Sequence, residues 1–353
     1  MDIHENKGLR TLFKDKTVFV VGAGASAEYG LPVGTELAEI IADSMWFKGD
    51  GFGNLINKDD PTIYFALKNH FKGTDKLNKH FDAARKIHEG IKHVDSIDNF
   101  LDMHHNDKET VFCGKTAIVK AILDAEERCQ LSYDTSNIYN TIDFDRVNKS
   151  WLKPFFKQLT LGRPKPDIEK VFEGITIICF NYDRCIEHYL IRVLNKAYSI
   201  DLKDAAKLVA SLEIYHPYGT VGELHTPLNP QGVAFGAELK REGLISAAQG
   251  IHTYTEQIED QNTIDKVKQA IANAKSLVFL GFAYHKQNID MLKPDKPGRI
   301  SSIFGTAYNL SDYNVTEVKS RVRSLAHGEI PILEIDSKNL MCGPFLDHYE
   351  MGL

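Results

Sequence analysis

The chain has 353 residues, of which 43% are apolar and 25% are charged, and its formal net charge is −6. This length and apolar content are sufficient for one large α/β domain with an insertion, and they argue against a disordered chain. The net negative charge argues against a protein that binds duplex nucleic acid, because such proteins usually show a basic face. No apolar run reaches the ~18 residues that a membrane-spanning helix needs.

The first ten residues, MDIHENKGLR, are polar and mixed in charge, which is typical neither of a secretory signal nor of a transit peptide. The chain contains five cysteines, which are Cys113, Cys129, Cys179, Cys185 and Cys342. Their odd number and wide spacing, without a Cys-x-x-Cys pair, do not fit a disulfide framework or a structural zinc module. We therefore expect a cytoplasmic protein with no membrane partner and no direct nucleic-acid partner.

Short apolar runs predict the strands of a parallel sheet. In chain order they are TVFVVG (17–22), ITIICF (175–180), LEIYH (212–216), SLVFLG (276–281), ISSIFG (300–305) and PILEID (331–336). Helical patterns lie between them at 186–198, 263–274 and 312–325. Because strands and helices alternate, we expect an α/β fold with a Rossmann-like, doubly wound parallel sheet.

Residues 36–170 have a different pattern. They contain helical stretches at 114–130 and 147–159 and no convincing strand. We expect this region to be a large, mainly helical insertion. The Rossmann-like core then consists of residues 1–35 and 171–340, and residues 341–353 form a C-terminal tail.

A glycine loop follows the first predicted strand, in the stretch TVFVVGAGASAEYGLPVG (17–34). Gly22, Gly24 and Ala27 fit the G-x-G-x-x-G/A pattern, in which backbone N–H groups at a helix N-terminus bind a pyrophosphate. In a dehydrogenase a second strand should end in an acidic residue about 20 residues later. The segment ELAEII (36–41) instead has helical spacing, which removes support for a dehydrogenase.

Other chemically informative residues follow three further predicted strands. Asn181 and Asp183 come directly after the predicted strand 175–180, and His216 is the last residue of the predicted strand 212–216. Gly281 is the last residue of the predicted strand 276–281, and Asn288 follows seven residues later. Open α/β sheets bind ligands at the carboxyl ends of their strands. We therefore expect one crevice that combines phosphate-binding, sugar-binding and proton-transfer groups.

Four of these motifs together resemble the sirtuin family. GAGAS (22–26), GLP (30–32), FNYD (180–183) and HPYG (216–219) stand in the same order as the sirtuin motifs. Sirtuins have G-A-G-x-S followed by G-[IL]-P, then Q-N-x-D after a strand, then a catalytic histidine closely followed by glycine. The resemblance covers the sheet part of the chain and implies a site for NAD⁺.

The chain also departs from the deacylating sirtuins. Those enzymes carry two Cys-x-x-Cys pairs that bind zinc, and this chain has neither pair. Their Asp-Phe-Arg stretch after GLP is Val33, Gly34 and Thr35 here, and the glutamine of Q-N-x-D is Phe180. These departures and the helical insertion are more similar to the sirtuin-like NAD⁺ hydrolases of bacterial antiphage defence.

The resemblance implies an NAD⁺ glycohydrolase that uses NAD⁺ as its substrate and needs no metal. Asn181 would position the ribose or the attacking water, His216 would be the general base, and Asp183 would orient the nicotinamide amide or a sugar hydroxyl. The expected NAD⁺-contacting residues are Gly22, Ala23, Gly24, Ala25, Ser26, Leu31, Pro32, Tyr182, Gly219, Gly281, Phe282 and Asn288. Among them, Ser26 would add a hydroxyl to the pyrophosphate cradle, and Gly281 would let the backbone approach the adenosine half.

Each assignment has a purely structural alternative. Asn181 and Asp183 can stabilise the start of the following helix, and a single histidine such as His216 is often structural. Asp95 and Asp98 either border the pocket or cap a helix. His104 and His105 point about 100° apart if they are helical, so they make a poor pair of metal ligands.

The function also has alternatives. An NAD-dependent protein deacylase or ADP-ribosyltransferase would release nicotinamide too, and a sensor would bind NAD⁺ or ADP-ribose without turnover. Whether NAD⁺ is hydrolysed or cyclised stays open. The family resemblance implies that NAD⁺ depletion in abortive infection is controlled by a homo-oligomer, by a separately encoded activator, or by both. Such an activator would be a ring-forming ATPase or a nucleotide-binding sensor protein.

Overall fold

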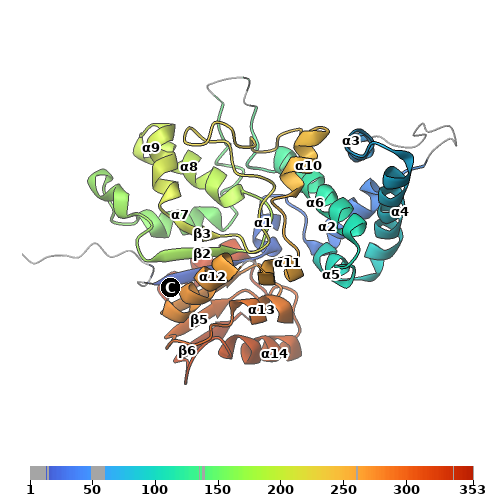
Figure 1. Cartoon of the computed structure of the whole chain (residues 1–353). Coiled ribbons are helices and arrows are strands. Elements are labelled where there is room, and N and C mark those ends of the chain that lie inside the picture. Colours follow the sequence, from blue (N-terminus) through green and yellow to red (C-terminus); the bar gives the residue numbers. More distant parts are fainter. Residues whose placement is uncertain are drawn as a thin grey trace, which may run out of the picture.

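The computed structural model describes Phe13 and residues 16–48, 60–134, 136, 140–259, 261–336 and 338–352. All six predicted strands are confirmed. They are β1 (Thr17–Val21), β2 (Ile175–Cys179), β3 (Glu213–Tyr215), β4 (Ser276–Leu280), β5 (Ser302–Gly305) and β6 (Ile332–Ile335). Figure 1 shows the sheet between helices on both sides, with α8 and α9 at the upper left and α13 and α14 at the lower right.

The strands form one parallel sheet in the order β3-β2-β1-β4-β5-β6. In register, Val20 of β1 lies opposite Ile178 on one side and Phe279 on the other. This is the strand order of the doubly wound dinucleotide-binding folds, in which the topological switch point lies between the first and fourth strands. The expected Rossmann-like architecture is therefore confirmed.

The strand sequences are continuously apolar because both faces of the sheet are covered. Along β1, Val18 and Val20 belong to one hydrophobic core, whereas Phe19 and Val21 belong to the other. Side chains of a strand alternate between the two faces, so a run without polar interruptions indicates burial on both sides. This burial is what fixes β1 at the centre of the molecule.

Helices of the predicted core cover the two faces. The face with Phe19 is covered by α7 (Leu152–Thr160), α8 (Cys185–Tyr198), α9 (Leu202–Ala210) and α15 (Cys342–His348). The face with Val18 is covered by α12 (Gln261–Asn273), α13 (Lys286–Leu292) and α14 (Asp312–Arg323). The helices expected at 186–198, 263–274 and 312–325 are thus confirmed as α8, α12 and α14. Two short helices, α10 (Glu242–Ala248) and α11 (Tyr254–Glu259), lie between β3 and α12 in the chain.

The described part of the region between β1 and β2 contains helices joined by turns and loops, and no strand. After α1 (Ala23–Ala27) it contains α2 (Gly34–Ser44), α3 (Thr62–His70), α4 (Thr74–Gly90), η1 (Ile91–His93), α5 (Ile97–Met103), α6 (Lys108–Arg128), α7 and η2 (Lys165–Lys170). Helices α2 to α6 lie together at one side of the sheet (Figure 1). The helix expected at 114–130 is α6, which begins earlier because Asp107 caps it by accepting from the Thr110 N–H at 3.0 Å.

The helix expected at 147–159 begins later, at Leu152. The Trp151 N–H is taken by the Glu28 carboxylate at 2.7 Å, and Pro154 lies in the first helical turn, where its missing N–H does no harm. Glu28 also accepts from the Gly343 N–H at 2.9 Å, at the start of α15. The predicted tail thus contains a helix, and its Phe345 is fully buried.

A buried ion pair joins α6 to the start of α8. The Arg184 Nε and backbone N–H donate to Glu126 Oε1 at 3.1 and 3.0 Å, and the two side chains are 2% and 0% exposed. The guanidinium also donates to the Val233 carbonyl at 2.7 Å, and the Gly236 N–H donates to Glu126 Oε2 at 3.0 Å. The pair therefore joins the helical region, the β2–α8 junction and the 222–236 loop.

Candidate functional site

The glycine loop after β1 contacts the chain that leaves β4, at the topological switch point. The Gly24 N–H donates to the Gly281 carbonyl at 3.0 Å. Gly281 has a φ of +57°, and a Cβ at this position would lie 2.0 Å from the Ala25 nitrogen. We expected Gly281 to admit the adenosine half of NAD⁺. In the structure it admits the glycine loop of its own chain.

Replacing Gly281 with alanine is therefore expected to lower the thermal midpoint of unfolding strongly. Gly328 is the matched control, because its φ is +80° but nothing lies within 4 Å of an added Cβ. The left-handed backbone costs about 1–2 kcal/mol at either position. Only Gly281→Ala adds a backbone clash, so equal midpoints for the two alanine variants would contradict the close contact.

Asn181 connects the end of β2 to the glycine loop. Its Nδ2 donates to the Gly22 carbonyl at 3.1 Å and to Ser26 Oγ at 2.8 Å. The Ser26 hydroxyl in turn donates to Asp183 Oδ2 at 2.8 Å. All three side chains are buried, so the structure brings Asn181, Ser26 and Asp183 together as one network. The amide oxygen of Asn181 is the part of this side chain that remains for a ligand or a water.

The surroundings of Asp183 favour its structural alternative. Oδ2 accepts from Ser26, and Oδ1 accepts from the Cys185 N–H at 3.1 Å in the first turn of α8. Burial raises the pKa of Asp183, against the lowering effect of these hydrogen bonds. Both carboxylate oxygens are therefore used inside the protein. Asn181, by contrast, does not cap α8, whose N-cap residue is Arg184.

The N–H groups of the glycine loop are also engaged. Those of Gly22, Gly24 and Ala25 donate to the carbonyls of Leu280, Gly281 and Gly22, each at 3.0 Å. A pyrophosphate at this loop would compete with these hydrogen bonds, and Ser26 is already bonded to Asn181 and Asp183. Of the other expected contact residues, Ala25, Leu31, Tyr182 and Phe282 are buried, and Ala23, Pro32 and Gly219 are partly exposed.

His216 lies directly after β3 and is bonded through both ring nitrogens. Nδ1 lies 3.1 Å from the Asn181 carbonyl oxygen, and Nε2 lies 3.0 Å from Glu187 Oε1. Burial by itself lowers the pKa of His216, but the Cys179 sulfur and the Glu187 carboxylate outweigh it and hold the pKa well above 6.5. The structure thus places His216 beside Asn181, in an ion pair that the sequence analysis did not anticipate.

A second polar cluster lies where the helical insertion meets the strand ends. Tyr182, after β2, donates its hydroxyl to Asp98 of α5. Tyr218, in the turn after His216, donates to Asn288 Oδ1 of α13 at 2.7 Å. Ser96 caps α5, so Asp98 is not the cap, and its carboxylate is instead the acceptor for Tyr182.

Sequence reasoning missed several residues of this region. Glu187 has a weak signal, because it is an acid in the first turn of a helix that follows a strand end. Tyr218 stands inside the quoted HPYG motif. Asp102 of α5, which accepts from Gln287 of α13 at 3.0 Å, has no local signal because its partner is far away in the sequence.

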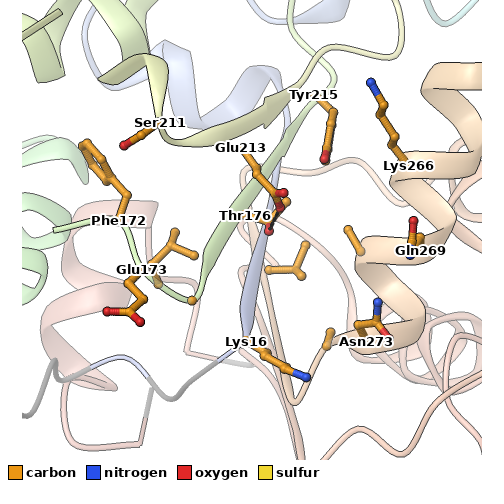
Figure 2. A pocket seen from close by; sticks show the side chains of 15 residues that line it. Lys16, Phe172, Glu173, Thr176, Ser211, Glu213, Tyr215, Lys266, Gln269 and Asn273 are labelled. Carbon is orange, nitrogen blue, oxygen red and sulfur yellow. Dashed lines mark hydrogen bonds between the residues drawn. The ribbon is translucent and has the colours of Figure 1, made fainter. Parts of the chain in front are cut away.

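A separate cavity of about 520 Å³ lies away from these residues (Figure 2). Lys16 and Gly174, which precede β1 and β2, line it together with Glu213 of β3 and Asn273 of α12. It therefore lies at the amino ends of the strands. Ligands of doubly wound sheets bind at the opposite, carboxyl ends.

Comparisons with known proteins and a search for metal or membrane features complete the description. No protein-family model matches the chain, and no curated protein is significantly similar to it. Among the described residues, no group of three or more His, Cys, Asp or Glu side chains is arranged to hold a metal ion. No helix in the described part of the chain is long and apolar enough to cross a membrane. The five cysteines are free and buried.

Proposed function

We propose that this protein is an NAD⁺ glycohydrolase that converts NAD⁺ to nicotinamide and ADP-ribose. One observation carries the proposal: the ends of β1, β2 and β3 bring together a glycine loop, an asparagine and a histidine at hydrogen-bond distance. The Asn181 side chain bonds to Gly22, and its carbonyl bonds to His216. This set lies beside the topological switch point, where sheets with this strand order bind dinucleotides.

The reaction needs few protein groups. The bond between ribose C1′ and the pyridinium nitrogen breaks, and nicotinamide leaves as a neutral molecule with the bonding electron pair. Water then adds to the oxocarbenium-like ribose, and a base removes one proton from that water. Asn181 Oδ1 is suited to accept a hydrogen bond from a ribose hydroxyl or from the water. His216 is suited to accept the proton at Nε2 once this nitrogen has lost its own proton to solvent and is released from Glu187.

A dehydrogenase is less well supported. The segment that would have to form its second strand is α2, and the strand that pairs with β1 is β2, after the whole helical region. The carboxylate near the end of that strand belongs to Asp183, whose two oxygens are bonded within the protein. A ribose diol at this place would have to displace Ser26 or the Cys185 N–H.

We further propose that the activity depletes NAD⁺ during antiphage defence and depends on assembly or on an activating partner. The motif resemblance supports the biological context. A dependence on activation is supported by the engaged glycine loop and by the two occupied nitrogens of His216. A homo-oligomer or a separately encoded ATPase or sensor protein is the expected activator.

Product analysis tests the proposed reaction. Purified full-length protein, alone and with the products of neighbouring genes, is incubated with NAD⁺ and the products are separated by chromatography. We expect nicotinamide and ADP-ribose in equal amounts, and His216→Ala should lose both. Acyl-ADP-ribose formed with an acylated peptide would indicate a deacylase, a labelled protein would indicate a transferase, and cyclic ADP-ribose would indicate cyclisation. Calorimetric binding without any product would contradict an enzyme and favour the sensor.

A further inference from the structure

His216 exchanges protons through its two ring nitrogens, and Glu187 holds one of them, Nε2, at 3.0 Å. We propose that Glu187 is a positioning residue that holds the His216 imidazole doubly protonated, so that Nε2 must lose its proton to solvent before it can accept one from the attacking water. The part of this inference that concerns turnover rests on the proposed function. The part that concerns the charge of His216 can be measured without any reaction.

The hydrogen-bond partners fix the protonation of the ring. The Asn181 carbonyl only accepts, so Nδ1 at 3.1 Å must carry a hydrogen. An ionised carboxylate also only accepts, so Nε2 at 3.0 Å from Glu187 Oε1 must carry one as well. In a Ser-His-Asp arrangement the carboxylate occupies one ring nitrogen and leaves the other for the substrate. Here neither nitrogen is left for a substrate.

Glu187 is well placed to stay ionised. It lies in the first turn of α8, where the helix dipole favours a negative charge. Burial works to raise the pKa of Glu187, but the His216 cation outweighs it and brings the pKa below its ordinary value. The second oxygen, Oε2, is buried and has no hydrogen-bond partner. The carboxylate is therefore held mainly by His216, so the loss of one contact would set it free.

The other charged groups near the pair do not replace this interaction. Cys179 of β2 raises the pKa of His216 only where its thiol is ionised, and burial raises the pKa of that thiol. Asp183 is bonded to Ser26 and Cys185. Arg184 acts on Glu187 only through its charge, because its guanidinium is bonded to Glu126 and to backbone carbonyls. Glu187 is thus the carboxylate in direct contact with His216.

Removal of the Glu187 charge should lower the pKa of His216, because the carboxylate is one of the groups that raise it. A base with a raised pKa becomes active only as the pH rises through that pKa. Glu187→Gln should therefore shift the rising limb of nicotinamide release to lower pH and make release near pH 7 faster than in the wild-type protein. The ion pair stabilises the folded chain below pH ~6.5, and this contribution is lost as the pH rises through the raised pKa.

The test is a pH titration of histidine ring signals by NMR on the full chain, paired with the pH profile of nicotinamide release. The His216 signal is assigned as the one missing from His216→Gln. We expect it to stay protonated well above pH 6.5 in the wild-type protein and in Glu187→Asp, and to titrate at lower pH in Glu187→Gln. Glu213→Gln is the matched control. Glu213 is exposed on β3 and does not contact His216, and its replacement removes the same charge from the chain.

The outcomes are distinguishable. A wild-type midpoint near 6.5, or one that Glu187→Gln leaves unchanged, would overturn the inference. A shifted midpoint with an unshifted profile of nicotinamide release would overturn the role of Glu187 in turnover. A shifted midpoint without nicotinamide release from any variant or partner mixture would support the charge state and defeat the proposed function.

Discussion

Asn181→Ala is expected to reduce nicotinamide release from NAD⁺ on the order of 100- to 1,000-fold. Loss of one oriented polar group that stabilises a transition state typically has this effect. The alanine removes the amide oxygen proposed to meet the ribose or the water. It also removes the hydrogen bonds to Gly22 and Ser26 that fix the glycine loop. Initial rates at saturating NAD⁺ measure the loss.

The control is Asn148→Ala, because Asn148 is exposed in a turn of the helical region and bonds only locally, to Asp145. This variant should keep full activity. Thermal unfolding and ADP-ribose binding of Asn181→Ala separate a lost catalytic contact from a collapsed loop. Unchanged turnover in a folded Asn181→Ala protein would remove Asn181 from the mechanism.

Glu126→Gln is expected to lower the free energy of unfolding by about 3–5 kcal/mol. Glutamine has nearly the same shape, but it leaves the Arg184 guanidinium buried without a counter-charge, and removal of one partner of a buried pair typically costs this much. The Gly236 N–H loses a charged acceptor at the same time. Urea unfolding followed by circular dichroism measures the change.

An exposed pair provides the comparison. Arg85 and Asp82 of α4 lie 2.6 Å apart, but their side chains are 61% and 68% exposed. Asp82→Asn should therefore leave the urea midpoint unchanged, since solvent screens exposed pairs. If Glu126→Gln and Asp82→Asn unfolded at the same urea concentration, the Glu126–Arg184 pair would not stabilise the contact between the helical region and the sheet.

The sheet was predictable because its strands are buried on both faces. A run such as TVFVV has no polar interruption, and strand and helix patterns alternate from β2 to β6. The starts of α6 and α7 were misplaced for local reasons. The Asp107 cap extends α6, and the Glu28 carboxylate binds the Trp151 N–H just before α7. That second contact joins residues 123 positions apart and leaves no trace in a local pattern.

The candidate site was predictable only in part. Residues at strand ends were identified correctly as neighbours, because parallel strands bring their carboxyl ends to one edge. What the sequence did not reveal is how their hydrogen bonds are used. Asp183 and Ser26 face each other, and His216 faces Glu187. Whether a polar group is available to a ligand depends on three-dimensional partners, and a motif does not record them.

A crystal structure determined after soaking with NAD⁺ tests the central claim most directly. We expect the nucleotide at the carboxyl ends of β1, β2 and β4, with ribose C1′ beside the Asn181 amide oxygen. In crystals of the activated protein it should be ADP-ribose, without the nicotinamide. A nucleotide bound in the cavity of Figure 2 at the amino ends of the strands, and none at the carboxyl ends, would contradict it.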